Sequence, residues 1–195
     1  GVLDVRYQGR KIAYLDLTFL HDGVPRKTLF AEWNAPDLRE PNLPESLDYT
    51  DALRKLLGSL HICSRERVIR QYDHEVKGKT GLKPLMGRSG KTPQDAAVMR
   101  LGFDSYEGIA ISNGILPRYG DLDAYQMSAG AFDEAVRQII SVGGRLPNIE
   151  PNTNLFWSVN DNFCVPDSVY DPVNNPDGKA KLAKLIQMCE ALFDM

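Results

Sequence analysis

An amphipathic run over residues 125–142, which ends at Gly143-Gly144, constrains the fold more than any other stretch of this sequence. Its apolar residues recur three and four positions apart, as they do along one face of an α-helix. They are Met127, Phe132, Ala135, Val136, Ile139 and Ile140. A glycine pair at this point fits a helix that ends in a left-handed cap. The sequence therefore predicts a helix of about five turns that must bury one side.

Short apolar segments precede this helix, and a second amphipathic run follows it. Residues 94–101 and 107–113 have the length and composition of strands. Residues 178–194 predict a helix with one apolar side. The connection 145–177 is rich in Asn, Asp and Pro, and so long an irregular stretch usually serves a function or contacts a partner. Strands and helices that mix without strict alternation favour an α+β fold.

The N-terminal third follows a different pattern. Residues 2–7 and 11–19 alternate apolar and polar side chains around a short Gly-containing turn, which predicts a β-hairpin. Three prolines then fall within a polar stretch that is typical of a linker. We therefore expect a hairpin unit at 1–33, a linker at 34–47 and an α+β domain at 48–195.

The start of that domain predicts two helices and a strand. Leucines at 53, 56, 57 and 60 mark one helical face, and Asp48 is a suitable N-cap for this helix. Ser64 can begin a second, short helix that reaches about Ile69. Residues 70–76 have the alternation of a strand.

Composition excludes several function classes. The chain has 195 residues, of which 43% are hydrophobic and 25% charged, as in an ordinary globular sequence. Its net charge of −3 comes from interspersed acids and bases, so we expect no nucleic-acid partner. No apolar run is long enough to cross a bilayer, so we expect no membrane partner either.

The three cysteines, Cys63, Cys164 and Cys189, are widely spaced and form no C-x-x-C pair. Free thiols in a reducing cytoplasmic setting are the simplest account of this pattern. The chain opens without an initiator Met and stops close to a helix, which suggests a piece of a larger protein.

The stretch GRSGKT (87–92) resembles the end of a phosphate-binding P-loop. A P-loop needs a glycine five residues before its Gly-Lys-Ser/Thr, and Leu85 stands at that position. A P-loop also opens directly into a helix, whereas Pro93 follows here and the apolar run comes after the loop. We interpret 87–92 as a loop that leads into a strand, with Asp95 at the mouth of that strand.

Acidic and amide side chains are placed where they could bind a cation. Glu134 and Gln138 are four residues apart on the long predicted helix, so they share a face. With Asp95 they offer the oxygen ligands that Mg²⁺ prefers, in a site that would be shared with substrate phosphates. The alternative is an ordinary solvated helix face, since most acidic side chains are exposed.

A series of motifs gives the sequence a family resemblance. In chain order they are Ile62-Cys63-Ser64, RQYDHEVKG (70–78), DAAV (95–98), GIAISNG (108–114), DEAVRQIISVGG (133–144), NDNFCVPD (160–167) and NNPDG (174–178). Over 48–195 the chain resembles the phosphoribosylformylglycinamidine synthase family, specifically the N-terminal half of its second aminoimidazole-ribonucleotide (AIR)-synthetase-like module. The hairpin at 1–33 resembles the end of the preceding module.

The resemblance implies an ATP-dependent ligase of purine biosynthesis. Such an enzyme converts formylglycinamide ribonucleotide, glutamine and ATP to the amidine, ADP, phosphate and glutamate. The implied fold is a curved mixed sheet of about four strands with helices on one face, while the other face closes a barrel with a second module. The implied partners are the first module, the C-terminal half and a glutaminase. A chain with that face exposed is expected to form a homodimer.

The resemblance also assigns site residues. Asp95 and Glu134 match family positions that ligate Mg²⁺ at a nucleotide site holding ATP or ADP. Gln138 stands where the family commonly has a metal-binding Asn, and Gln94 stands where a small residue is usual. Arg65 stands where the family has a basic residue that contacts the nucleotide phosphates. Asp161 and Asn162 fall in or beside the segment that contacts ATP in the family.

Two alternatives stay open. The module could be a non-catalytic scaffold whose nucleotide only stabilises an interface, or the chain could belong to a sister ATP-dependent enzyme of the AIR-synthetase superfamily. Those sister enzymes carry a Gly-rich N-terminal nucleotide segment, which this sequence lacks.

Overall fold

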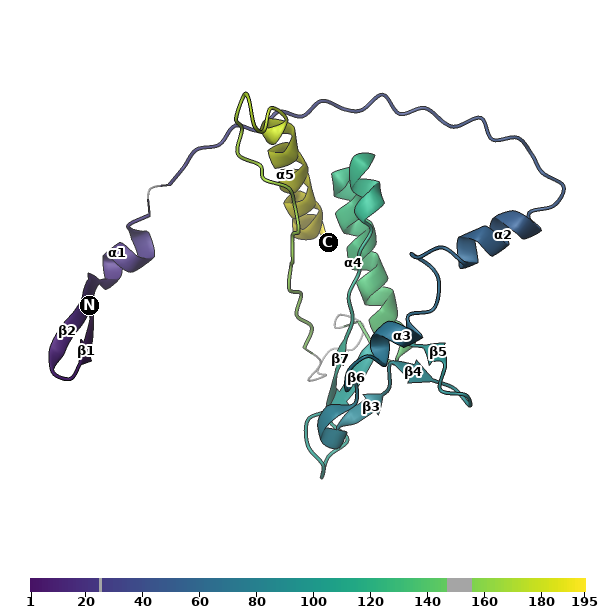
Figure 1. The fold of residues 1–195 in the computed structure, drawn as a ribbon, viewed down its shortest axis with the longest axis horizontal. Coiled ribbons are helices and arrows are strands. Elements are labelled where there is room, and N and C mark those ends of the chain that lie inside the picture. The colour runs from purple at the N-terminus through teal and green to yellow at the C-terminus, as the bar shows by residue number, and fades with distance from the viewer. Residues whose placement is uncertain (25, 147–155) are drawn as a thin grey trace.

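The computed structural model describes residues 1–24, 26–146 and 156–195 (Figure 1). In chain order the elements are β1 (Val2–Tyr7), β2 (Arg10–Asp16), α1 (Leu17–Asp22), α2 (Thr50–Leu57), α3 (Glu66–Ile69), η1 (Val76–Gly78), β3 (Thr80–Leu82), β4 (Leu85–Met86), β5 (Thr92–Pro93), β6 (Ala97–Arg100), β7 (Gly108–Ile111), η2 (Pro117–Asp121), α4 (Ala124–Ser141) and α5 (Gly178–Asp194). Helices and antiparallel strands thus occur together, which confirms the α+β class.

The N-terminal hairpin forms as expected. β1 and β2 pair antiparallel around a turn in which Gln8 and Gly9 have positive φ. The second strand is shorter than predicted because Asp16 caps a helix, α1, by accepting hydrogen bonds from the amides of Thr18 and Phe19. An extended segment, 26–49, carries neither helix nor strand and leads from this unit to α2 (Figure 1).

The main sheet has three antiparallel strands in the order β3-β6-β7. Val98 pairs with Ala110 and Met99 with Ile109. The prediction of a mixed sheet of about four strands was wrong in detail, because among the described residues every strand pair is antiparallel. β4 and β5 form a small separate hairpin in which Gly87 and Gly90 have positive φ.

The predicted strand at 70–76 was also wrong. This segment forms turns and bends that lead into η1, where Lys77 and Gly78 both have positive φ. Ion pairing accompanies the turns, since Lys83 lies 3.0 Å from Glu75. Alternating polarity alone could not distinguish this turn segment from a strand, because the strand also needs a pairing partner.

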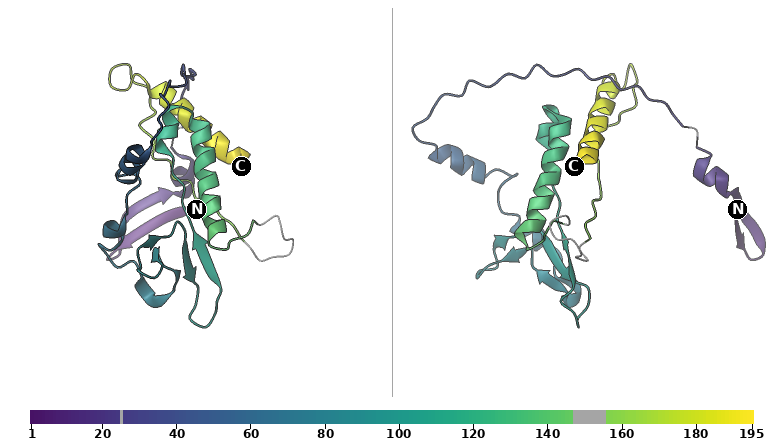
Figure 2. Two further views of the ribbon diagram at one scale, coloured as in Figure 1. Left: turned by 90° about the vertical axis from the view of Figure 1, so that its right-hand side faces the viewer. Right: turned by 180° about the vertical axis from the view of Figure 1, so that it is seen from behind.

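The two long helices pack side by side (Figures 1 and 2). Asp123 caps α4 by accepting from the amide of Gln126, and the helix ends before Gly143, whose φ is +94°. Small residues dominate the buried positions of both helices, with Ala129 on α4 and Ala183 on α5. Alanine lets the helix axes approach closely, and this pair holds most of the buried residues of the described part of the chain.

A polar network precedes α5. The carboxamide of Asn175 is buried, and its Nδ2 donates to the carbonyl oxygens of Asp167 and Val169 at 2.8 and 2.6 Å. Lys181 donates to its Oδ1 at 2.6 Å. These contacts tie the irregular segment that ends near 177 to the first turn of α5.

Much apolar surface is left uncovered. The accessible area is 16657 Å², whereas a compact monomer of this mass exposes about 9300 Å². On the main sheet, Met99, Ile109 and Ile111 share one face and remain 40 to 53% exposed. No helix of the described part is long and apolar enough to cross a membrane.

Candidate functional site

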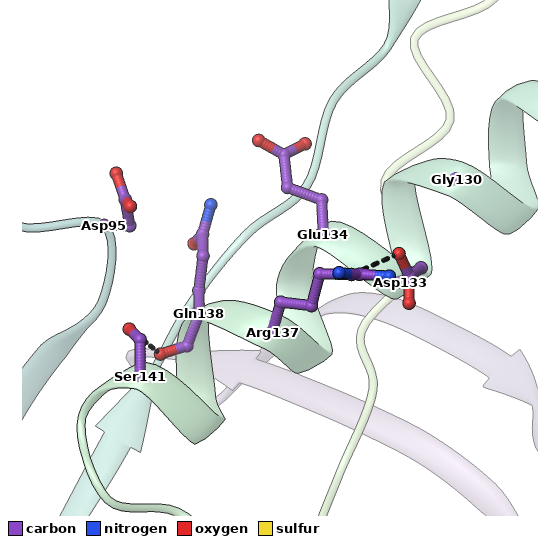
Figure 3. A pocket seen from close by; sticks show the side chains of 7 residues that line it. All are labelled: Asp95, Gly130, Asp133, Glu134, Arg137, Gln138 and Ser141. Carbon is purple, nitrogen blue, oxygen red and sulfur yellow. Dashed lines mark hydrogen bonds and ion pairs between the residues drawn. The ribbon is translucent and has the colours of Figure 1, made fainter.

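An open concavity of about 370 Å³ lies between α4 and the segment that leads into β6 (Figure 3). Its lining residues are Asp95, Gly130, Asp133, Glu134, Arg137, Gln138 and Ser141. The structure thus places all three residues predicted as metal ligands, Asp95, Glu134 and Gln138, around one hollow, although they come from segments about 40 residues apart in the chain.

The helix and the strand each explain part of this arrangement. Glu134, Gln138 and Ser141 recur every three or four residues along α4, so they project from the same face. Asp95 directly precedes Ala96, which is only 3% exposed and fixes the chain just before β6 begins. The carboxylate of Asp95 is therefore held at the rim of the concavity, across from α4 (Figure 3).

A loop after β7 holds two of these side chains by its backbone. The amide of Ile115 donates to Oε2 of Glu134 at 2.9 Å, and the amide of Asn113 donates to Oε1 of Gln138 at 3.4 Å. The hydroxyl of Ser112 donates to the carbonyl oxygen of Ala135 at 2.8 Å. Sequence reasoning missed this role, although Ser112 and Asn113 fall in the GIAISNG motif and Ile115 directly follows it.

Arg137, the basic side chain that lines the concavity, already forms an ion pair. Nε of Arg137 lies 2.6 Å from Oδ2 of Asp133, one turn away on α4. Both side chains are more than half exposed, so water and salt screen the pair and it adds little to stability. The ion pair uses Asp133, which the sequence analysis did not assign to the site, and among the described residues Glu134 forms no salt bridge.

The donor set fits a small hard cation. Asp95 offers a carboxylate, Glu134 retains Oε1, and Gln138 offers an amide carbonyl oxygen. Among residues 1–24, 26–146 and 156–195, no three His, Cys, Asp or Glu side chains group as metal ligands. A cation site at this concavity would therefore need the amide oxygen of Gln138 beside the two carboxylates. Mg²⁺ accepts such a site because it commonly uses one or two carboxylates and keeps water or phosphate oxygens for the rest.

The three predicted nucleotide contacts lie outside the concavity. Arg65 is exposed beside Cys63, whose Sγ accepts from its Nη1 at 3.7 Å. Asp161 and Asn162 are exposed on the irregular segment before α5. None of the three lines the concavity, and their assignment to a nucleotide stays a prediction.

Comparison with known proteins finds relatives that share one name. No model of a protein family matches the chain. A phosphoribosylformylglycinamidine synthase subunit PurL from Thermoplasma volcanium is 30% identical over 196 residues, which cover 98% of this chain and 23% of that protein. The subunit PurL from Ignicoccus hospitalis is 38% identical over 147 residues, or 74% of this chain and 20% of that protein.

A third relative carries the same name. The subunit PurL from Rhodopseudomonas palustris is 33% identical over 158 residues, which cover 77% of this chain and 19% of that protein. The chain spans about a fifth of the length of these curated relatives. Over that span, it belongs to the phosphoribosylformylglycinamidine synthase family.

Proposed function

We propose that this chain contributes a magnesium–nucleotide site to an ATP-dependent amidotransferase of purine biosynthesis. The enzyme would convert formylglycinamide ribonucleotide, glutamine and ATP to formylglycinamidine ribonucleotide, ADP, phosphate and glutamate. One observation carries the proposal: Asp95, Glu134 and Gln138, which come from two elements, line the same concavity. The names of the relatives point to the same enzyme.

Each residue has a distinct part in the proposal. Asp95 and Oε1 of Glu134 would bind the cation directly, and Gln138 would add its carbonyl oxygen. Bound Mg²⁺ would neutralise charge on the nucleotide phosphates. The two backbone amides of the loop after β7 hold the side chains of Glu134 and Gln138 in place before a ligand arrives.

Further parts of the proposal extend beyond the concavity. Arg65 would contact the nucleotide phosphates, and Asp161 and Asn162 would belong to a strip that contacts ATP. The chain would form the N-terminal half of a second AIR-synthetase-like module, in the cytoplasm. Its partners would be the first module, the C-terminal half and a glutaminase, because one set of oxygen ligands cannot also bind the acceptor and deliver ammonia.

Calorimetric titration of ADP tests the nucleotide site. With Mg²⁺ present we expect weak binding that EDTA abolishes, and Asp95→Asn should weaken it about tenfold or more, as loss of a metal-site contact commonly does. Asp104→Asn is the matched control, because Asp104 is an exposed acid outside the concavity. Equal affinity of both variants, or binding that EDTA leaves intact, would reject the proposal.

An assay of ADP release tests how the site is used. With ATP, Mg²⁺, ammonia and formylglycinamide ribonucleotide, we expect no turnover above background, because phosphoryl transfer needs metal, phosphate clamps and acceptor positioned together. Turnover that Asp95→Ala abolishes would contradict this and make the chain a self-sufficient enzyme. Tight ADP that never turns over would instead favour the scaffold alternative.

A further inference from the structure

Segment 112–115 contacts α4 through three hydrogen bonds, and two of them end on the proposed cation ligands. The amides of Asn113 and Ile115 donate to Gln138 and Glu134, while the hydroxyl of Ser112 donates to a helix carbonyl. Backbone amides are fixed donors. A carboxylate that accepts from one of them loses most of the rotamer freedom that a long Glu side chain has in water.

A glycine makes this approach possible. A Cβ at Gly114 would lie 1.7 Å from the carbonyl oxygen of Ala131, so the backbone of the segment rests directly on the helix. The helix contributes a glycine of its own, because a Cβ at Gly130 would lie 2.7 Å from the side chain of Leu116. Gly114 does not have a positive φ, so the requirement comes from contact distance alone.

We infer that Gly114 is a positioning residue for the cation site, a role that rests on the proposed function. By letting segment 112–115 touch α4, it places the Ile115 amide on Oε2 of Glu134 and leaves Oε1 to the cation. The cation then meets one preset oxygen rather than a mobile carboxylate. A side chain at 114 would lift the segment and release both Glu134 and Gln138.

The test measures Mn²⁺ binding by electron paramagnetic resonance, because Mn²⁺ is a spectroscopic substitute for Mg²⁺. Gly114→Ala should weaken Mn²⁺ binding about tenfold, the usual effect of removing a contact that orients a ligand. Gly143→Ala is the control. Gly143 has φ +94° and no atom within 4 Å of an added Cβ, so its loss strains the end of α4 without touching the segment.

A second variant covers the case in which Gly114→Ala does not fold. Ser112→Ala removes only the hydroxyl bond to Ala135 and adds no atom. It should weaken Mn²⁺ binding severalfold, in the same direction. If neither folded variant binds Mn²⁺ more weakly than Gly143→Ala does, the positioning role is contradicted.

Amide hydrogen exchange separates positioning from general stability. A cation that needs the segment in place must in turn stabilise it, so saturating Mg²⁺ should slow exchange at Ile115 in the unmodified chain, and Ser112→Ala should need a higher Mg²⁺ concentration for the same slowing. Bound Mg²⁺ that leaves exchange at Ile115 unchanged in the unmodified chain would overturn the inference while the cation site stands. An unmodified chain that binds no Mn²⁺ would contradict the proposed site and, with it, this inference.

Discussion

The backbone amide of Ile115 donates a hydrogen bond to Oε2 of Glu134 over 2.9 Å. This bond joins the loop after β7 to the middle of α4, and it leaves Glu134 only partly exposed. A carboxylate held in this way differs from the freely solvated helix face that the sequence also allowed. Glu134 lines the same concavity as Asp95, so the contact supports the cation-site interpretation.

Removing the buried amide of Asn175 should destabilise the entry to α5. Asn175→Ala leaves the carbonyl oxygens of Asp167 and Val169 and the ammonium of Lys181 without this partner. We expect the free energy of unfolding to fall by about 1–3 kcal/mol, measured by urea denaturation. Asn174→Ala is the control, since the hydrogen bonds of Asn174 go to the carboxylate of Asp171 and not to the partners of Asn175. Equal losses for the two variants would contradict the account.

The same turn should respond to acid. The backbone amides of Asn174 and Val173 donate to the carboxylate of Asp171 and lower the pKa of that group. A lowered pKa in the folded state means that the stabilisation is fully present above the unfolded value, about pH 4. It is lost as the pH falls through the lowered pKa. A carbon-detected NMR titration should show Asp171 titrating below an unfolded peptide reference, and a midpoint at or above that reference would contradict the prediction.

The uncovered sheet face should drive self-association. Met99, Ile109 and Ile111 together present an apolar face beside strand edges, which is a known hazard for association. We expect light scattering to give a dimer at high concentration and Ile109→Lys to shift the chain toward monomer. Tyr72→Lys, an exposed substitution in the turn before η1, should leave the dimer intact. A clean monomer of the unmodified chain at high concentration counts against this.

Local patterns in the sequence predicted the long elements well. The 3.6-residue period and the Gly143-Gly144 stop located α4, and alternation around Gly9 located the hairpin. These features depend on residues close together in the chain. The separate β4–β5 hairpin and the turns at 70–76 could not be predicted this way, because strand pairing is settled by distant partners.

The side chains of the candidate site could be predicted from the sequence, but the backbone groups that hold them could not. The i, i+4 spacing of Glu134 and Gln138 fixed their common helix face, and the DAAV motif singled out Asp95. The backbone donors at Asn113 and Ile115 carry no side-chain signal, so the sequence could not reveal them. Gly114 alone did not reveal the close contact with α4, because a glycine can mark a turn as well as a close contact.

Paramagnetic broadening by Mn²⁺ tests the central claim most directly, because it shows where on the chain a divalent cation binds. In amide NMR spectra, substoichiometric Mn²⁺ should first broaden the resonances around the concavity, those of Asp95, Glu134 and Ile115, and excess Mg²⁺ should reverse the effect. Asp95→Asn should require a higher Mn²⁺ concentration for the same broadening. Broadening that begins elsewhere, such as at the acidic turn around Asp171, and leaves the concavity unaffected would contradict the claim.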